Sequence, residues 1–437
     1  MGAFAHATCL NAGIKDVTFS CRGPKPYRRS EQNVPETPIA TQTVPAHVPA
    51  HLVWCYDFAT DPLFEKDPLE AQLALTKGAP EIFFSPLRGG FWVLTRFADI
   101  RDASRQPEIF SNYPAMIPAA VGRSRKMAPI EIDPPELDRY RMTLGPALAP
   151  PKAKAMEGEV RRIAGALLEG LAALGRADFV ERFSSKLPVR LFLKLVDVPE
   201  SEADKLHALH RQMTWAPDVD DRAAAGMALE RYYTGLVAAR REALGDDLIS
   251  GYLRAQPEGG PFSFEDVVDA TFQLFVAGLD TVTNSLSLSW RYLAENPSAQ
   301  QAIRDNPSII PAAADELLRY TSLISSTRTL TQDYVFRGVQ MRMGDRVLMP
   351  LRLANRDAEV FEDGDVVRFD RKANAHLAFG SGPHRCLGSH LARVEMIVAL
   401  EEWFARVPQF ALDPADPPIG HGGHALGLGR LPLIWAH

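Results

Sequence analysis

Cysteine is scarce and widely spread in this sequence. The 437 residues contain four cysteines, Cys9, Cys21, Cys55 and Cys386. Their spacing fits neither a zinc site built from paired C-x-x-C motifs nor the disulfide framework of a small secreted protein. We therefore expect a protein of a reducing compartment, for which the cytoplasm is the simplest choice.

The sequence also lacks long hydrophobic runs and an excess of either charge. Its most apolar windows, residues 272–278 and 396–400, are far shorter than the roughly 18 apolar residues of a membrane helix. The 48 basic and 54 acidic residues leave a formal charge of -6, so overall charge favours neither a nucleic acid nor an anionic membrane as the partner. With 46% apolar residues, the composition predicts a soluble globular protein and excludes a chain that is disordered throughout.

Residues 1–50 differ in composition from the rest of the chain. Lysine and arginine outnumber acidic residues before Glu31, and a proline-rich run follows. A targeting peptide and a disordered extension are the two interpretations, but His6 and Asn11 interrupt the apolar stretch that would form a signal core. We predict a disordered tail over residues 1–50 and one catalytic domain over residues 51–437.

The pattern after residue 50 is mainly helical. Apolar and charged residues alternate at helical spacing in residues 134–148, 154–173 and 199–214, whereas residues 91–95 and 346–350 have the β-branched and apolar character of short strands. We find no internal repeat and no low-complexity linker. The predicted fold class is mainly α with minor β.

The longest predicted helix begins after Ser263, an N-cap residue with Asp266 three positions later, and ends at Asn296, where Pro297 follows. A helix of about 30 residues spans roughly 50 Å, the diameter of a domain.

The centre of this helix contains polar residues within an apolar run. Gly278, Asp280 and Thr281 stand there, and buried polar groups destabilise a fold unless they are paired or used. In the structural alternative, Thr281 bonds to the preceding helical turn and Asp280 faces solvent. Taken alone, the pattern slightly favours this alternative.

A glycine-rich segment, residues 379–388, leads into an amphipathic helix at residues 391–404 and contains Cys386. The positive end of a helix dipole lowers the pKa of a thiol, so we expect a thiolate that binds a metal or attacks an electrophile. A nucleophilic cysteine with His384 or His390 as its base is one alternative. A buried structural cysteine is another.

Three motifs together resemble the cytochrome P450 family of haem-thiolate monooxygenases. They are Ala-Gly-x-Asp-Thr at residues 277–281, Glu-Leu-Leu-Arg at 316–319 and Phe-x-x-Gly-x-x-x-Cys-x-Gly at 379–388, in the order that the family has them. The resemblance covers about residues 49–437. It is strongest to the bacterial camphor-hydroxylase group, which residues 133–136 and 431–435 also echo.

The resemblance implies the cytochrome P450 fold, with the long central helix over a haem b cofactor. Cys386 would be the axial ligand of the haem iron. Phe379 would pack near the haem and the sulfur, and Gly388 belongs to the loop whose N–H groups bond the sulfur.

On the opposite side of the haem, the resemblance implies that Asp280 and Thr281 are the acid–alcohol pair that delivers protons for oxygen activation. Gly278 would leave the helix wall thin, and we expect a local widening of the helix there. The basic partner of Asp280 is open, because the helix that supplies it in the family carries His207, His210, Arg211 and Trp215 here.

Further residues have implied supporting roles. The haem propionates would be held by Arg141, Arg328 and His384. Glu316 and Arg319 would form a buried structural pair, completed by Arg368 or Arg371.

The substrate is less well defined by the resemblance. Camphor is doubtful because residues 121–127 contain no tyrosine, and Arg125 stands in its place. The predicted pocket wall suits a compact, largely apolar molecule of the terpenoid or norisoprenoid type, with Gln273 and His424 as polar anchors. The wall candidates are Met116, Arg125, Ile130, Gln273, Val276, Ile324, His424 and Ala425.

The chain has no flavin or nicotinamide motif of its own, so its electrons must come from a partner. The resemblance implies a [2Fe-2S] ferredoxin with its NADH-dependent flavin reductase, docked at Arg141, Arg385 and Arg393. We expect a monomer that inserts one atom of O2 into its substrate. A peroxide-driven or redox-neutral haem-thiolate enzyme and a non-catalytic haem or ligand-binding protein are the two alternatives.

Overall fold

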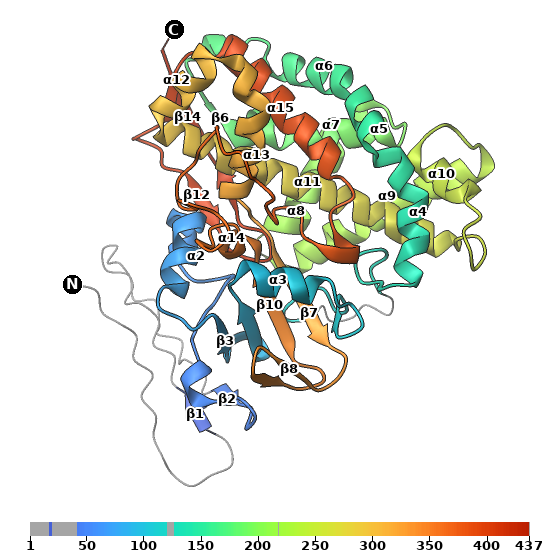
Figure 1. The fold of residues 1–437 in the computed structure, drawn as a ribbon. Helices are drawn as coiled ribbons and strands as arrows, with labels where there is room; N and C mark the ends of the chain where they lie inside the picture. The colour runs from blue at the N-terminus through green and yellow to red at the C-terminus, as the bar shows by residue number, and fades with distance from the viewer. Residues whose placement is uncertain (1–16, 20–41, 120–125, 217, 437) are drawn as a thin grey trace.

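Helices make up most of the molecule, and a smaller β-rich part lies at one end of them (Figure 1). This computed structural model describes residues 17–19, 42–119, 126–216 and 218–436. The predicted fold class, mainly α with minor β, is confirmed.

The helices follow the predicted pattern closely. Residues 134–148 form α4, residues 154–173 include α6, and residues 199–214 include α8. The α-helices in the described ranges are α1 Leu63–Lys66, α2 Pro68–Thr76, α3 Phe97–Ser104, α4 Glu136–Leu148, α5 Pro150–Ala155, α6 Glu157–Leu168, α7 Lys186–Leu195, α8 Ala203–Trp215, α9 Val219–Glu242, α10 Leu248–Arg254, α11 Phe264–Glu295, α12 Pro297–Asp305, α13 Ile310–Tyr320, α14 Leu351–Ala354 and α15 Ser389–Arg406.

The main sheet has the strand order β3-β4-β10-β7-β5, with β10 parallel to β4 and its other pairs antiparallel. Both predicted strands are confirmed as β4 and β10. Its strands are β3 Ile82–Ser85, β4 Phe91–Leu94, β5 Phe110–Ser111, β7 Ser325–Leu330 and β10 Arg346–Pro350.

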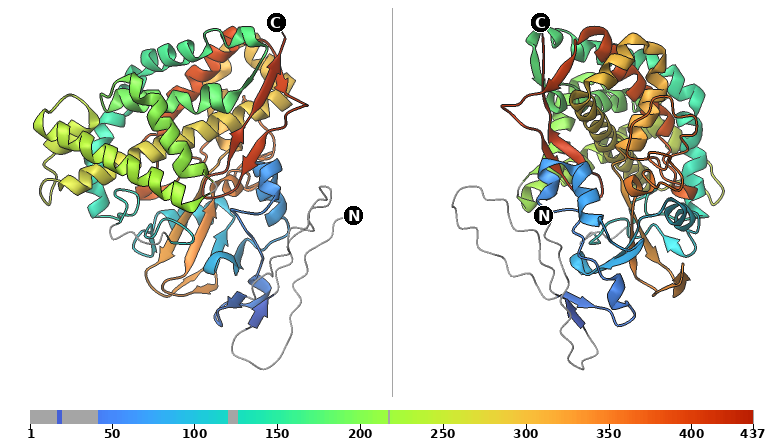
Figure 2. Two further views of the ribbon diagram at one scale, coloured as in Figure 1. Left: turned by 180° about the vertical axis from the view of Figure 1, so that it is seen from behind. Right: turned by 60° about the vertical axis from the view of Figure 1, so that its left-hand side comes forward.

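Smaller sheets accompany the main sheet, and the strands near the C-terminus lie along the edge of the helical part when the molecule is viewed from behind (Figure 2). They are β11-β14-β6, formed by Phe410–Leu412, Pro432–Trp435 and Arg176–Asp178; β12-β13, formed by Ile419–His421 and Gly427–Arg430; β8-β9, formed by Tyr334–Phe336 and Val339–Met341; and β1-β2, formed by Val17–Phe19 and Gln42–Val44.

The long helix α11 runs through the helical part as the sequence predicts. Its N-terminus is a complete capping box, in which Ser263 Oγ accepts the Asp266 N–H at 3.0 Å and Asp266 Oδ2 accepts the Ser263 N–H at 2.9 Å. The helix ends at Asn296, and Pro297 begins α12.

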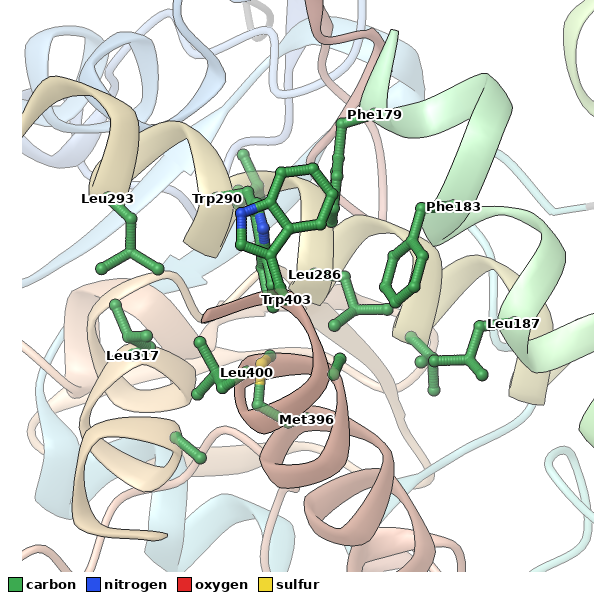
Figure 3. Close-up of a cluster of buried hydrophobic side chains, with 14 of the residues drawn as sticks. Phe179, Phe183, Leu187, Leu286, Trp290, Leu293, Leu317, Met396, Leu400 and Trp403 are labelled. Carbon is green, nitrogen blue, oxygen red and sulfur yellow. The ribbon is translucent and has the colours of Figure 1, made fainter. Parts of the chain in front are cut away.

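A cluster of aromatic side chains fixes α11 against α15 (Figure 3). The rings of Phe179 and Trp290 stack with their centroids 4.8 Å apart, and Trp403 meets both edge-on. All three side chains are fully buried, and such rings contribute both buried area and preferred packing geometry. This core therefore fixes the C-terminal part of α11 against α15, the helix that follows Cys386.

Folded structure begins before the domain boundary predicted at residue 50. Val44 in β2 and Val48 are buried in the core of the β-rich part, and β2 pairs with β1. The remainder of the predicted tail, residues 1–16 and 20–41, lies outside the described residues. Within the described ranges, each helix is too short or too polar to span a bilayer.

Candidate functional site

The Cys386 loop leads into the N-terminus of α15, and a hydrogen bond within its own backbone fixes it. The Cys386 N–H bonds the carbonyl of Phe379 at 2.9 Å, and α15 begins three residues after the cysteine. Gly382 has a φ of +69°, and a Cβ atom there would lie 2.1 Å from the carbonyl oxygen of Ser104. Glycine is therefore required at this position for the loop to pass α3.

Burial controls the acidity of Cys386. Loss of solvent raises the pKa of the thiol, while the Gly388 N–H and the charges of Arg385, Arg141 and Arg393 act in the opposite direction. The expectation of a lowered thiol pKa is wrong for the protein without a cofactor, because desolvation raises the pKa more than the groups at the helix terminus lower it. Cys386 still has accessible surface. A strongly desolvated residue with accessible surface faces a hollow inside the protein rather than bulk solvent.

The centre of α11 also borders open space. Ala277 is exposed although Phe275 and Leu279 beside it are buried, and a Cβ atom on Gly278 would meet nothing within 4 Å. Thr281 Oγ1 donates to the carbonyl oxygen of Ala277 at 2.8 Å, as the structural alternative predicts. The helix is α-helical throughout, so the expected local widening is not observed.

The basic group nearest to Asp280 comes from α8. His210 Nε2 lies 3.5 Å from Asp280 Oδ1, and the Asp280 side chain is 28% exposed. The His210 ring packs edge-on against Phe275, which fixes where it meets α11. His421 in β12 also lies within electrostatic reach of Asp280. Burial lowers the pKa of His421, and the negative charge of Asp280 acts against this lowering. The sequence could name His210 as one candidate among several and gave no signal for His421.

Two of the three predicted propionate ligands, His384 and Arg328, lie near Asp133, an acidic residue that the sequence did not assign to the site. His384 Nε2 lies 3.0 Å from Asp133 Oδ1. Arg328 is buried, donates to Asn112 Oδ1 and the Thr327 carbonyl, and has a pKa lowered to about 10 by burial, with Asp133 only partly compensating. Burial also lowers the pKa of Arg141, which lies within electrostatic reach of Cys386.

These groups fit a haem. A buried arginine whose burial is not compensated by its acidic neighbour suits an anionic propionate. Cys386, on the wall of a hollow, would supply a sulfur ligand, and the backbone at Ala277 and Gly278 is open to a flat molecule.

The predicted structural pair is a triad. Arg319 donates from Nε and Nη2 to the two oxygens of Glu316, both at 2.8 Å, and these side chains are sealed from solvent. Arg371 Nε lies 3.2 Å from both oxygens, so it is the second arginine. Arg368 contributes its backbone N–H at 2.9 Å, while its guanidinium lies near Asp363.

Phe379 begins the segment that carries Cys386, and its carbonyl accepts the Cys386 N–H. Its ring is partly buried against the main hydrophobic core, and the Arg393 guanidinium lies 4.6 Å from the ring centroid. Gly388 approaches the sulfur closely, since a Cβ atom there would be 4.0 Å from Cys386 Sγ.

Part of the predicted substrate wall is brought together. Ile324 and Ala425 are partners in an isolated β-bridge. Met116 and Ile130 are exposed, and Arg125 lies outside the described residues.

The two predicted polar anchors differ in their surroundings. On α11, Gln273 is buried and its Oε1 has no hydrogen-bond partner among the described residues, while the neighbouring Val276 is half-buried. His424 instead contacts Ile117 through Nε2 and Ser325 through Nδ1. Gln273 Oε1 thus has an unused acceptor, whereas both ring nitrogens of His424 are engaged within the protein.

The sequence of this chain is similar to those of known haem-thiolate proteins. The family description "Cytochrome P450" matches residues 191–414. A "Probable cytochrome P450 127A1" of Sinorhizobium fredii is 32% identical over 91% of this chain and 98% of its own length. A "Vitamin D(3) 25-hydroxylase" of Pseudonocardia autotrophica is 30% identical over 85% of this chain and 94% of its own.

Solved structures give the same result. Cytochrome P450 CYP101C1 is 34% identical, with a TM-score of 0.84 over 90% of this chain and 100% of that one. CYP101J2 is 32% identical, with a TM-score of 0.82 over 90% and 99%. The loop cysteine, the acid–alcohol pair and the buried triad thus occur in a chain that matches these proteins over nearly its whole described length, and the chain belongs to the cytochrome P450 family of monooxygenases.

Proposed function

We propose that this monooxygenase hydroxylates a compact, largely apolar substrate of the terpenoid or norisoprenoid type, with electrons from a [2Fe-2S] ferredoxin and its NADH-dependent flavin reductase. The observation that carries the proposal is the acid–alcohol pair. Thr281 lies beside the open backbone at Ala277, and Asp280 is partly exposed next to His210. A chain that only stored a haem or a ligand would have no use for this arrangement.

The proposed cofactor is haem b. Cys386 would ligate its iron, Arg141, Arg328 and His384 would hold its propionates, and the bound cofactor would supply the iron centre at which O2 is activated. The Gly388 N–H would bond the ligand sulfur.

The chain's own groups provide a route for protons. Asp280 is exposed enough to exchange protons with solvent and close enough to His210 for that ring to hold its carboxylate. Thr281 is one residue further along α11, and its hydroxyl needs only to leave the Ala277 carbonyl to donate into the hollow. Two protons per turnover could be delivered to the reacting oxygen in this way.

The substrate class follows from the candidate wall. Ile324, Ala425, Val276 and Met116 are apolar, so they favour a compact hydrocarbon skeleton. Gln273 is a buried carboxamide with an unpaired Oε1, and an unpaired buried polar atom is costly. One hydroxyl or carbonyl group on the substrate would satisfy it, since an amide can present either its oxygen or its nitrogen.

The electron donor is proposed to dock on the side of Cys386. Arg385 is exposed there, Arg141 is half-buried, and Arg393 Nε is 2.7 Å from Asp315 Oδ1. Because Asp315 offsets the charge of Arg393, we propose that Arg385 makes the largest contribution to attracting an acidic ferredoxin.

The first test is the absorption spectrum of the reduced protein with and without carbon monoxide. Wild type should show the strongly red-shifted Soret band of a haem-thiolate, and Cys386→Ala should lose it. A carbonyl spectrum of the histidine type in folded wild-type protein would contradict the assignment of Cys386.

The second test compares NADH consumption with product formation in a system reconstituted with ferredoxin and reductase. Thr281→Ala should consume NADH and release hydrogen peroxide while forming several-fold less product. Equal product per NADH in both proteins would contradict the role of the hydroxyl. Turnover with hydrogen peroxide but not with NADH would favour the peroxide-driven alternative.

A further inference from the structure

The loop at residues 114–117, which carries the wall candidate Met116, is fastened to separate elements through its backbone. Glu131 Oε1 accepts the Ala115 N–H at 2.9 Å. Arg346 in β10 donates from Nη2 to the carbonyl oxygens of Pro114 and Met116, at 2.8 and 2.6 Å. The remaining bond is made by His424, whose Nε2 accepts the Ile117 N–H at 2.9 Å.

The ring of His424 is fixed from its other sides. It packs edge-on against Phe58, with the ring centroids 5.0 Å apart. Nδ1 lies 3.3 Å from the Ser325 carbonyl oxygen and 3.4 Å from Thr327 Oγ1. Because Nε2 accepts from Ile117, Nδ1 carries the proton and donates to Ser325, so the ring is neutral in this arrangement.

His424 stands between the two candidate walls of the substrate pocket. Ala425 follows it directly, and Ala425 pairs with Ile324 in the isolated bridge. The Ser325 N–H bonds the His424 carbonyl at 2.8 Å, which fixes this histidine to β7 as well. One imidazole thus joins the loop that carries Met116 to the segment that carries Ile324 and Ala425.

We propose that His424 is a positioning residue, which holds the 114–117 loop against the Ile324–Ala425 bridge and thereby limits the size of substrate that the pocket accepts. The size limit rests on the proposed function, since it needs these residues to line the substrate pocket. The fastening of the loop does not.

The charged surroundings favour the neutral ring that the contact requires. Burial is the main cause of a lowered His424 pKa. The backbone carbonyls of Ser325 and Ile117 oppose this lowering, and the nearby charges of Arg346 and Arg88 add to it. Glu131 faces Arg346, and Asp57 pairs with Arg88 at 2.8 Å, so both cations have acidic partners. A protonated Nε2 would no longer accept from Ile117 and would instead face the Ile117 carbonyl oxygen at 3.3 Å.

The test compares His424→Phe with His424→Gln in the haem-loaded protein. Phenylalanine keeps a ring against Phe58 but has no acceptor, whereas glutamine places an oxygen about where imidazole places Nε2. Amide hydrogen exchange at Ile117, measured by mass spectrometry with residue-level fragmentation, should be about tenfold faster in His424→Phe and near wild type in His424→Gln. The Ala115 amide, bonded to Glu131, is the internal reference.

The second measurement is the substrate-induced spin shift for a series of terpenoid ketones of increasing size. In His424→Phe, affinity for the larger members should rise relative to the smaller ones, by about five- to tenfold across the series, while His424→Gln should follow wild type.

The two measurements test the loop fastening and the size limit independently. Unchanged exchange at Ile117 in His424→Phe would overturn the fastening, even if monooxygenase activity is intact. Faster exchange with unchanged size preference would overturn the pocket limit and keep the fastening. Equal acceleration in both variants would show that packing of the imidazole, and not its acceptor nitrogen, holds the loop, which would also overturn the proposal.

Discussion

The two sides of the proposed haem site are held together in different ways. On the cysteine side, Glu316 bonds Arg319 twice at 2.8 Å and Arg371 as well, and the Glu316 and Arg319 side chains are sealed from solvent. On the opposite side, Asp280 is 28% exposed and its nearest basic group, His210, is 3.5 Å away. The first arrangement is saturated with charge-assisted bonds, whereas in the second the His210 ring lies near the carboxylate at 3.5 Å and His421 lies within electrostatic reach of it.

This difference matches what each side must do. A sealed, bidentate pair has one geometry and resists rearrangement, which suits a segment that must hold a metal ligand in place. A partly exposed carboxylate whose basic neighbours are not bonded to it tightly can rotate and exchange its proton with solvent, which a proton relay requires. We therefore expect mutations on the cysteine side to change stability and those on the opposite side to change chemistry.

The largest effect should come from Glu316→Gln, which leaves Arg319 and Arg371 buried without a full negative partner. Breaking a buried pair in this way costs about 3–5 kcal/mol of unfolding free energy, so the protein should unfold at a clearly lower denaturant concentration. The matched control is Glu159→Gln, because Glu159 and Arg162 have the same spacing and the same 2.8 Å contact at the surface. That change should cost no more than about 1 kcal/mol. Equal midpoints for the two variants would contradict the contrast between the sides.

The second effect is on turnover. Asp280→Asn keeps the size of the side chain and removes its proton exchange, so we expect product formation to slow by about 100-fold. The substrate-induced spin shift and the denaturation midpoint should stay near those of wild type. A variant that loses substrate binding to the same extent would show that Asp280 is a structural residue, like those on the cysteine side.

How much the sequence predicts also differs between the two sides. Glu316 and Arg319 are three residues apart on one helix, and Cys386 lies in a local motif, so short-range patterns are sufficient to place them. The contact of His424 with Ile117 joins residues 307 positions apart and depends on how the chain folds back. The same holds for His210, which meets Asp280 only because its ring packs against Phe275.

Burial depth is the other property that the sequence does not contain. The expected low pKa of the Cys386 thiol considered the helix terminus alone, and the folded structure shows that desolvation has the larger influence. The choice of Arg371 over Arg368 is of the same kind. Both lie near Glu316, but only the Arg371 side chain turns inward to it.

A third, smaller effect should come from His210→Phe. Phenylalanine retains the ring contact with Phe275 while removing the basic group beside Asp280. We expect turnover to fall by about tenfold, less than for Asp280→Asn, with a larger solvent deuterium isotope effect on the rate. His207→Phe, one helical turn earlier on α8, is the control. An equal loss in both variants would indicate a general disturbance of α8 rather than a contact with Asp280.

The smallest effect concerns the surface of the cysteine side. There an exposed arginine and an arginine with an acidic partner lie only eight positions apart in the sequence. Arg385 is exposed, whereas Arg393 is bonded to Asp315 and lies over Phe379. Arg385→Glu should therefore slow ferredoxin-driven reduction by about three- to tenfold at low salt, and the deficit should shrink as ionic strength rises, because steering between exposed charges is screened. Arg393→Glu should instead lower stability, since it places a second acid beside Asp315.

The two variants thus separate a docking charge from a structural one on the same face. A salt-independent deficit for Arg385→Glu, measured by stopped-flow reduction under carbon monoxide, would place the ferredoxin elsewhere.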